Sequence, residues 1–300
     1  PPAMYGDSHA YGIPLTGSGT EASVATIDRD DLVNFHRAWV RPSNSRIFVV
    51  GDTTVDEIKP LLESTIGRWA DTRMAVPRKN IVEVSLPEAP KVVIVDRPGS
   101  PQSYIIAGHV VPSPEAENDL AIDMMNDVLG GSFTARINMN LREDKGWSYG
   151  ARTRVVTARG QRPWIITAPV QTDKTGDALR EIVAELEAYQ TDRPATEAEL
   201  ERNVLNNTRA LPGRFETADA VLRSMARNAG LERPLDYAAS LKQRYDALTL
   251  DDVNEAAREV IDPDGLIWVV VGDREAIEEQ IRSVDLGEIE FWDADGMAIQ

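Results

Sequence analysis

One stretch of the sequence occurs twice, and this repeat constrains the fold more than any other feature. Residues 30–52 match residues 251–273 without a gap, and the two copies open on DDLVNFHRAWVRP and DDVNEAAREVIDP, 221 residues apart. Each copy is typical of an acid-capped helix, a proline stop, a buried apolar strand, a Gly-Asp turn and a further helix. A repeat distance this long indicates a duplicated domain rather than a solenoid.

The repeat also sets the expected domain boundaries. The second copy can be followed back to Lys91, so a first copy of equal length would begin about 130 residues before residue 1. We therefore expect the C-terminal part of a first domain at 1–75, a linker at 76–90, a complete second domain at 91–285 and a tail at 286–300. An incomplete first domain predicts exposed apolar surface near residues 1–75, which could drive association.

Within the complete domain, strand patterns come first and helical patterns cluster late. Strands are expected as a hairpin of 91–96 with 102–110 and as a second hairpin of 149–157 with 164–170. Between the hairpins, Ser113 followed by Pro114 predicts the start of a helix, whose apolar stripe would be Ala121, Met124, Met125 and Val128. This order predicts an α+β fold with helices on a mainly antiparallel sheet, and not a doubly wound parallel sheet.

The composition excludes several classes of function. The chain has 49 acidic and 32 basic residues, a net charge of −17, which repels nucleic acid and anionic lipid. No apolar run approaches the roughly 20 residues of a membrane-spanning helix. The absence of cysteine removes disulfides, thiol nucleophiles and cysteine-bound zinc. Partners are therefore expected to include no nucleic acid, and no membrane insertion is expected.

Metal and nucleophile signatures are missing from the sequence. The histidines His9, His36 and His109 lie far apart, and no H-x-x-E-H stands in either direction. No G-x-S-x-G elbow is present either. We expect no metal site in this chain.

The segment from Gly130 to Gly150 combines several local signals. Gly130-Gly131 is most simply a helix C-cap, and Ser132 then predicts the cap of a helix that buries Phe133, Ile137 and Leu141 on one face. Gly146 predicts its end. Considered alone, Arg142 is a cation at a helix C-terminus and Tyr149 begins a half-buried strand, so neither residue by itself indicates a function.

This segment, continued to Ala151, closely resembles the second-domain motif of the insulinase/pitrilysin family of zinc metallopeptidases, which includes the mitochondrial processing peptidase. Residues 35–52 look like the close of that family's first domain, and residues 9–17 (HAYGIPLTG) like the segment before it. Residues from about 90 to 285 look like its whole second domain. The resemblance implies a duplicated mitochondrial-processing-peptidase/LuxS-like domain of the α+β class.

The resemblance also implies roles for individual residues. In this family the first domain carries H-x-x-E-H, and the second contributes an Arg and a Tyr seven residues apart, a spacing that Arg142 and Tyr149 match. Tyr149 would donate a hydrogen bond to the oxyanion of the reaction, and Arg142 would hold a substrate carbonyl. The loop Gly130, Gly131, Ser132 and Phe133 occupies the position of a glycine-rich segment that handles substrate.

The resemblance implies that this chain is the non-zinc portion of a peptidase-like protein that binds and cleaves extended peptides. Zinc would be held in the full-length protein or in a partner subunit, and the chain alone would be inactive. The alternatives are a catalytically inactive assembly or scaffold subunit and a peptide-binding module. Expected partners are an extended peptide, a zinc-bearing first domain or subunit, and, as a homodimer, a second copy of the chain. A bacterial periplasmic or envelope location is favoured.

Overall fold

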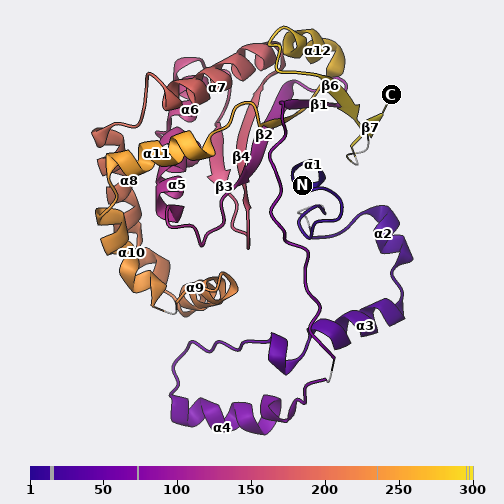
Figure 1. Cartoon of the computed structure of the whole chain (residues 1–300), viewed down its shortest axis with the longest axis vertical. Helices are drawn as coiled ribbons and strands as arrows, with labels where there is room; N and C mark the ends of the chain where they lie inside the picture. Colours follow the sequence, from indigo (N-terminus) through magenta and orange to yellow (C-terminus); the bar gives the residue numbers. More distant parts are fainter. Residues whose placement is uncertain (14–16, 73, 235, 295, 297, 300) are drawn as a thin grey trace.

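The computed structural model describes residues 1–300 except 14–16, 73, 235, 295, 297 and 300, so part of the expected 9–17 segment lies outside the described residues (Figure 1). Its centre is a seven-stranded sheet in the order β3-β4-β2-β5-β1-β6-β7. The strands are β1 (Lys91–Asp96), β2 (Gln102–Val111), β3 (Arg152–Val155), β4 (Arg162–Gln171), β5 (Ile267–Gly272), β6 (Ile289–Trp292) and β7 (Ala298–Ile299).

Pairing in the sheet is mainly antiparallel. Strand β1 runs parallel to β5 and β6, and the other four pairings are antiparallel. With helices layered on the sheet, this confirms the predicted α+β class. Residues 286–300, expected as a tail, supply β6 and β7, which extend the sheet at the edge of β1.

The first predicted hairpin is wrong, because β1 and β2 are not neighbours. Strand β5 lies between them, with Val270 opposite Ile94 on one side and Ile105 on the other. The run Ile267–Gly272 is apolar on both faces, which suits a central strand with a partner on each side. The 97–101 connection, with Gly99 at a φ of 71°, therefore spans two strand positions instead of closing a hairpin. The second hairpin, β3 with β4, is confirmed.

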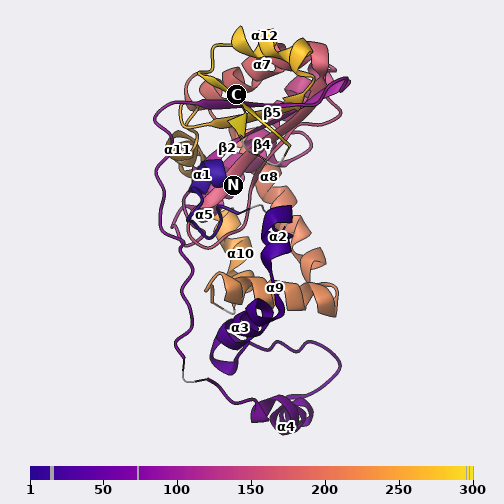
Figure 2. The same ribbon diagram turned by 90° about the vertical axis from the view of Figure 1, so that its right-hand side faces the viewer.

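The helices of this part of the chain pack mainly on one face of the sheet (Figures 1 and 2). They are α5 (Asp119–Asn126), α6 (Arg136–Asn138), α7 (Thr175–Gln190), α8 (Glu197–Ala210), α9 (Ala218–Gly230), α10 (Tyr237–Asp246), α11 (Leu250–Val260) and α12 (Arg274–Arg282). Apolar side chains of these helices other than α9 join Ile105, Trp268 and Val270 in one buried core. Burying such side chains contributes about 1.5–3 kcal/mol each.

Helix α5 starts later than predicted. Ser113 and Pro114 stand in a turn, in which Ser113 Oγ accepts only a long hydrogen bond of 3.4 Å from the Glu115 N–H, and the helix begins at Asp119. The predicted apolar stripe is confirmed, since Met124 and Met125 are fully buried.

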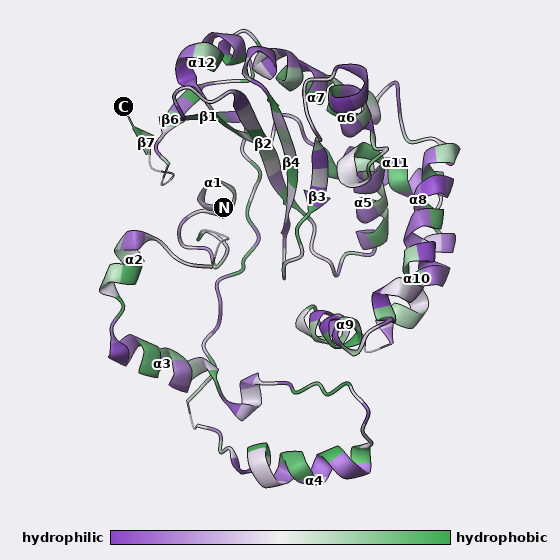
Figure 3. Cartoon of the chain, turned by 180° about the vertical axis from the view of Figure 1, so that it is seen from behind, coloured by the Kyte–Doolittle hydropathy of each residue, from purple (hydrophilic) through white to green (hydrophobic). Residues whose placement is uncertain are grey.

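The N-terminal quarter of the chain looks different. Its helices are α1 (Pro2–Tyr5), α2 (Glu21–Thr26), α3 (Arg29–Trp39) and α4 (Val55–Thr65). Helix α1 lies on the sheet face opposite the helix layer, while α3 and α4 lie well away from the sheet (Figure 2). No residue of α2, α3 or α4, helices described in full, is buried. The predicted apolar exposure is confirmed (Figure 3).

The strand predicted within residues 47–52 is absent from this described stretch, which is extended but unpaired. A strand exists only where a neighbour satisfies its backbone N–H and C=O groups. Val49 remains exposed there, whereas its counterpart Val270 is fully buried in β5. No helix among the described residues is long and apolar enough to cross a membrane.

Candidate functional site

The predicted helix after the glycine pair is shorter than expected. Ser132 Oγ donates to the backbone oxygen of Asp127 and does not cap the helix that follows. That helix therefore begins only at Arg136, and it continues as a π-helix over Met139–Asp144. Ile137 and Leu141 are buried as predicted, but Phe133 is 64% exposed. Phe133 precedes the helix and therefore falls outside its buried stripe.

The glycine pair is required by close packing. A side chain on Gly130 would meet the backbone nitrogen of Thr153 in β3 at 2.5 Å, and one on Gly131 would meet Asn126 Nδ2 at 2.5 Å. Neither glycine has the left-handed φ of the predicted C-cap. The missing side chains instead let Gly130 lie close to the backbone of β3 and Gly131 lie close to Asn126 in the preceding turn. Gly130 is buried, and Gly131 is exposed.

Arg142 is joined to the predicted loop. Its guanidinium carbon lies 4.6 Å from the centre of the Phe133 ring, within the range of a cation–π contact, and its Nε lies 3.4 Å from a carboxylate oxygen of Glu143. The Arg142 side chain remains 36% exposed. The structure thus brings together two of the sequence-predicted groups, the arginine and the loop tip, at one surface.

Tyr149 stands on a short turn whose backbone is tightly held. Its side chain is 88% exposed and makes no hydrogen bond to the described residues. The hydroxyl of buried Ser148, directly before Tyr149, donates to the Pro169 oxygen at 2.6 Å. The same Oγ accepts from the N–H of Gly150, directly after Tyr149, at 3.1 Å. Tyr149 lies outside β3, which starts at Arg152, so the expectation that it begins a half-buried strand is wrong. A fixed backbone presents a free phenol to solvent.

Asn138, which no sequence motif predicted as a site residue, links the Phe133 loop to the chain that follows Tyr149. Its Nδ2 donates to the Phe133 oxygen at 2.6 Å, and its Oδ1 accepts from the Ala151 N–H at 3.1 Å. Asn138 is itself buried. One buried amide therefore connects the Phe133 loop to the strand entry beyond Tyr149. A polar residue beside the buried Ile137 was the available signal, because a buried amide normally has a specific partner.

Zinc does not fit the residues of this chain that the structure describes. The ring nitrogens of His9 pair with the Val82 oxygen and the Tyr11 N–H, and His109 is engaged by the backbone of Val110 and Asp262. Burial lowers the pKa of His109. Among the described residues, no three His, Cys, Asp or Glu side chains converge as metal ligands.

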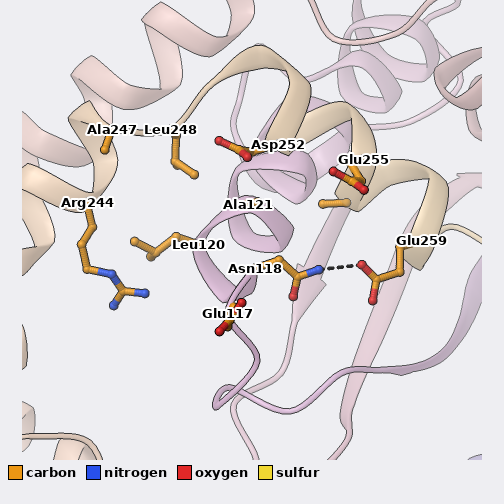
Figure 4. Close-up of a pocket in the computed structure, with 11 residues that line it drawn as sticks. Glu117, Asn118, Leu120, Ala121, Arg244, Ala247, Leu248, Asp252, Glu255 and Glu259 are labelled. Carbon is orange, nitrogen blue, oxygen red and sulfur yellow. Dashed lines mark hydrogen bonds between the residues drawn. The ribbon is translucent and has the colours of Figure 1, made fainter.

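The larger cavities lie away from the Arg142–Tyr149 segment. Figure 4 shows one of about 650 Å³ between α5, α10 and α11, around which stand Glu117, Asp252, Glu255, Glu259 and Arg244. Glu259 accepts a 2.7 Å hydrogen bond from Asn118 there. A second cavity of about 710 Å³ lies between α1 and the apolar outer face of the sheet. Among the described residues, no predicted site residue lines either one.

Comparisons with known proteins give a consistent result. The family model described as "Peptidase M16 inactive domain" matches residues 26–206. An uncharacterised zinc protease of Mycobacterium tuberculosis is 24% identical over 266 residues, which are 86% of this chain and 58% of that protein. The chain thus spans little more than half the length of such relatives.

Solved structures share the fold. The peptidase M16 inactive domain from Pseudomonas fluorescens superposes with a TM-score of 0.75 at 20% identity, over 91% of this chain and 63% of that one. A protease from Helicobacter pylori gives a TM-score of 0.76 at 20% identity, over 84% and 61%.

Proposed function

The chain belongs to the M16 peptidase inactive-domain family, of the insulinase/pitrilysin type, and on that premise we propose that it forms the non-zinc wall of a peptide-cleaving site. Residues 91–285 would be the second domain of that site. Residues 1–75 would complete a first domain, whose remaining part is supplied from outside this chain or by a partner subunit.

The observation that carries the proposal is the presentation of Tyr149. Its phenol is exposed and has no hydrogen bond to the described residues, although the backbone on both sides is fixed. The fixed backbone sets where the phenol can reach, and a donor preorganised in the assembled site would contribute about 2.7–4 kcal/mol when negative charge develops. We assign Tyr149 O–H as the donor to the oxygen of the scissile carbonyl.

Arg142 would act in the same site as a positioning cation. Its stacking on Phe133 restrains the guanidinium, while 36% of the side chain stays open to a ligand. A guanidinium offers several N–H donors in a fixed plane, which suits a peptide carbonyl. The exposed Gly131 and Phe133 and the half-buried Ser132 would line the path of the peptide, and buried Gly130 would support them from below.

Zinc would supply an activated water and polarise the carbonyl, and it would be held outside this chain. The residues of this chain bind and orient the peptide and stabilise the developing charge. We therefore propose that the chain alone does not turn over substrate.

The exposed apolar surface of residues 1–75 supports the need for a covering partner. Leu32, Phe35 and Val55 are all more than half exposed. Leu32 and Phe35 stand one turn apart on α3, and large exposed apolar side chains grouped in this way are typical of an interaction site. The cover would be the rest of a first domain, and a second copy of the chain could occupy the same surface when that cover is missing.

The test uses the enzyme assembled from this chain and its zinc-bearing portion, with a fluorogenic peptide. Tyr149→Phe removes one donor and should lower kcat by about 10²–10³-fold with little change in KM. Arg142→Ala should lower kcat/KM mainly through KM. Tyr104→Phe, at another exposed tyrosine, is the matched control and should leave both constants unchanged. Unchanged turnover in Tyr149→Phe would contradict the assigned role and leave the tyrosine a packing or assembly residue.

A further inference from the structure

A third cavity, smaller than the two described above, is lined by residues of helices α9 and α10. The proposed function does not involve it. Its volume is about 180 Å³, and its walls come from α5, the start of β4, the Pro212–Phe215 turn, α9 and α10. Four arginines line it, namely Arg162, Arg214, Arg227 and Arg233. In a chain of net charge −17, four guanidiniums around one small cavity are a local reversal of sign.

Arg162 supplies an unpaired donor at this cavity. The residue is only 4% exposed. Its Nε donates to the Pro112 oxygen at 2.8 Å and its Nη1 to Asp119 Oδ1 at 2.7 Å, but Nη2 is buried with no hydrogen-bond partner among the described residues. An unsatisfied buried donor on a charged group costs more than a neutral one, so its presence calls for a partner.

Arg233 repeats the pattern on the same carboxylate. Its Nη2 donates to Asp119 Oδ2 at 2.6 Å, and its Nε is buried without a partner among the described residues. The guanidinium lies over the Tyr237 ring, 4.3 Å from its centre. Asp119 thus serves two guanidiniums with one negative charge. One positive charge and two N–H donors remain uncompensated.

The remaining charges at the cavity do not cancel this excess. Arg214 and Arg227 are exposed residues that add two further cations to the lining. Asp123 is the one acidic residue among the described residues that line the cavity, and its Oδ1 lies 3.9 Å from Arg162 Nη1. Even when it is ionised, its single charge offsets only one of the two cations that Arg214 and Arg227 add. Apolar side chains, including Leu231 and Leu241, complete the walls and limit the water that could screen the charges.

We propose that this cavity, here called the guanidinium cavity, binds a small free oxyanion whose carboxylate or phosphate oxygens accept from Arg162 and Arg233. Planar guanidinium N–H groups match such oxygens in pairs, and charge-assisted bonds of this type are the strong ones. The volume lies below the roughly 300–1,000 Å³ of pockets for larger ligands, which favours a free anion over a segment of peptide.

Asp123 gives the cavity a pH dependence. Although its side chain is 45% exposed, desolvation raises the pKa of Asp123 to about 7. The charged or titratable groups that face it are Asp119 on its own helix, Asp127 directly after that helix, Arg162 on β4, Arg233 beyond α9 and Tyr245 on α10. Below this pKa the carboxyl is neutral and accommodates an anion. Above it the carboxylate repels one, so the affinity should fall as the pH rises.

The test is calorimetric titration of the 300-residue chain with sulfate, inorganic phosphate and propionate, against chloride at equal ionic strength and below pH 7. At least one oxyanion should bind at one site, and the sulfate affinity should fall above pH 7. Sulfate serves for the pH series because its own charge is constant there. The ratio of the phosphate affinity to the propionate affinity shows whether the cavity prefers a phosphate or a carboxylate ligand. Absence of binding by all three would overturn the proposal.

Variants locate the site. Arg162→Lys keeps the charge but removes the free Nη2 donor, and it should weaken binding about tenfold. Arg227→Gln, at an exposed position, should weaken binding about threefold and keeps the test open if the first variant does not fold. Arg223→Gln, one turn away on α9 and outside the lining, is the matched control and should bind like the parent chain. Equal affinity in Arg227→Gln and Arg223→Gln would place the anion elsewhere and contradict the proposal.

Discussion

Helices α3 and α11 both begin with a capping box that is closed by an equivalent aspartate, Asp31 or Asp252, yet their surroundings are opposite. Val253 in α11 is fully buried, whereas its counterpart Leu32 in α3 is 61% exposed. The following segments diverge in the same way, because β5 is central in the sheet and residues 47–52 have no strand partner among the described residues. Local signals therefore suffice for a helix, but a strand and a core need the rest of a domain.

The caps are the part that both copies retain. Asp28 Oδ1 accepts from the N–H groups of Asp30 and Asp31 at 2.7 and 2.9 Å, and Thr249 Oγ1 accepts from the Asp252 N–H at 3.2 Å. Each helix has a reciprocal bond that completes a capping box. The same local interaction thus exists in the packed helix α11 and in the unpacked helix α3. Comparing the two helices shows what tertiary packing adds to a capped helix.

The largest predicted contrast concerns a buried charge. Val253→Asp should lower the free energy of unfolding by more than about 3 kcal/mol, because an ionised carboxylate would lie unpaired in the core. Leu32→Asp should change it by less than about 0.5 kcal/mol, since the side chain already meets solvent. Urea unfolding followed by tryptophan fluorescence measures both.

The same pair sharpens the domain assignment. In a protein that contains the proposed first domain in full, Leu32→Asp should become strongly destabilising. If it stays neutral there, α3 is not covered by a first domain and the proposed assignment of residues 1–75 fails.

The second contrast concerns the caps themselves. Thr249→Ala should lower the free energy of unfolding by about 1 kcal/mol, because α11 belongs to the cooperative core. Asp28→Ala should reduce helical content in far-ultraviolet circular dichroism but leave the global urea midpoint nearly unchanged. Equal midpoint shifts in the two variants would mean that α3 unfolds together with the sheet, and the comparison would break.

The smallest expected effect is a pH dependence at the buried copy. Side-chain and backbone hydrogen bonds with Thr249 hold the pKa of Asp252 below its usual value. The ionised form is favoured in the folded state, so this stabilisation is present above the unfolded pKa of about 3.9 and is lost as the pH falls through the lower folded value. Asp252→Asn should therefore cost less than about 0.5 kcal/mol near neutrality, because solvent screens the group, and nothing in acid.

A series of urea midpoints from neutral to acid pH checks this expectation. Asp251→Asn, in the same turn but outside the capping box, is the control and should show a smaller change with pH. A cost for Asp252→Asn that grows toward acid pH would contradict the assigned sign.

How much of the fold can be predicted from the sequence depends on how far apart in the sequence the interacting residues lie. The α+β class, the β3–β4 hairpin and the Met124–Met125 stripe follow from local periodicity and turn residues. The position of β5 between β1 and β2 was not predictable in that way. It depends on which strands find partners across more than 150 residues of sequence.

At the candidate site the same division holds. The place of Arg142 near the end of the helix and the stop at Gly146 follow from the sequence pattern, but the exposed turn that carries Tyr149 does not. The exposure of Phe133, the contact of Gly130 with Thr153 and the role of Asn138 depend on how distant backbone segments meet. A propensity argument contains no information about such contacts.

The directional amide of Asn138 has a dynamic consequence. Its nitrogen holds the Phe133 carbonyl and its oxygen holds the Ala151 N–H, so the loop and the tyrosine turn share one pivot. An aspartate has the same shape but would set an acceptor against the carbonyl and release the loop alone. With asparagine in place, thermal displacements of the two segments are correlated. Whatever moves the loop tip on contact with a ligand is transmitted to the strand entry beside Tyr149.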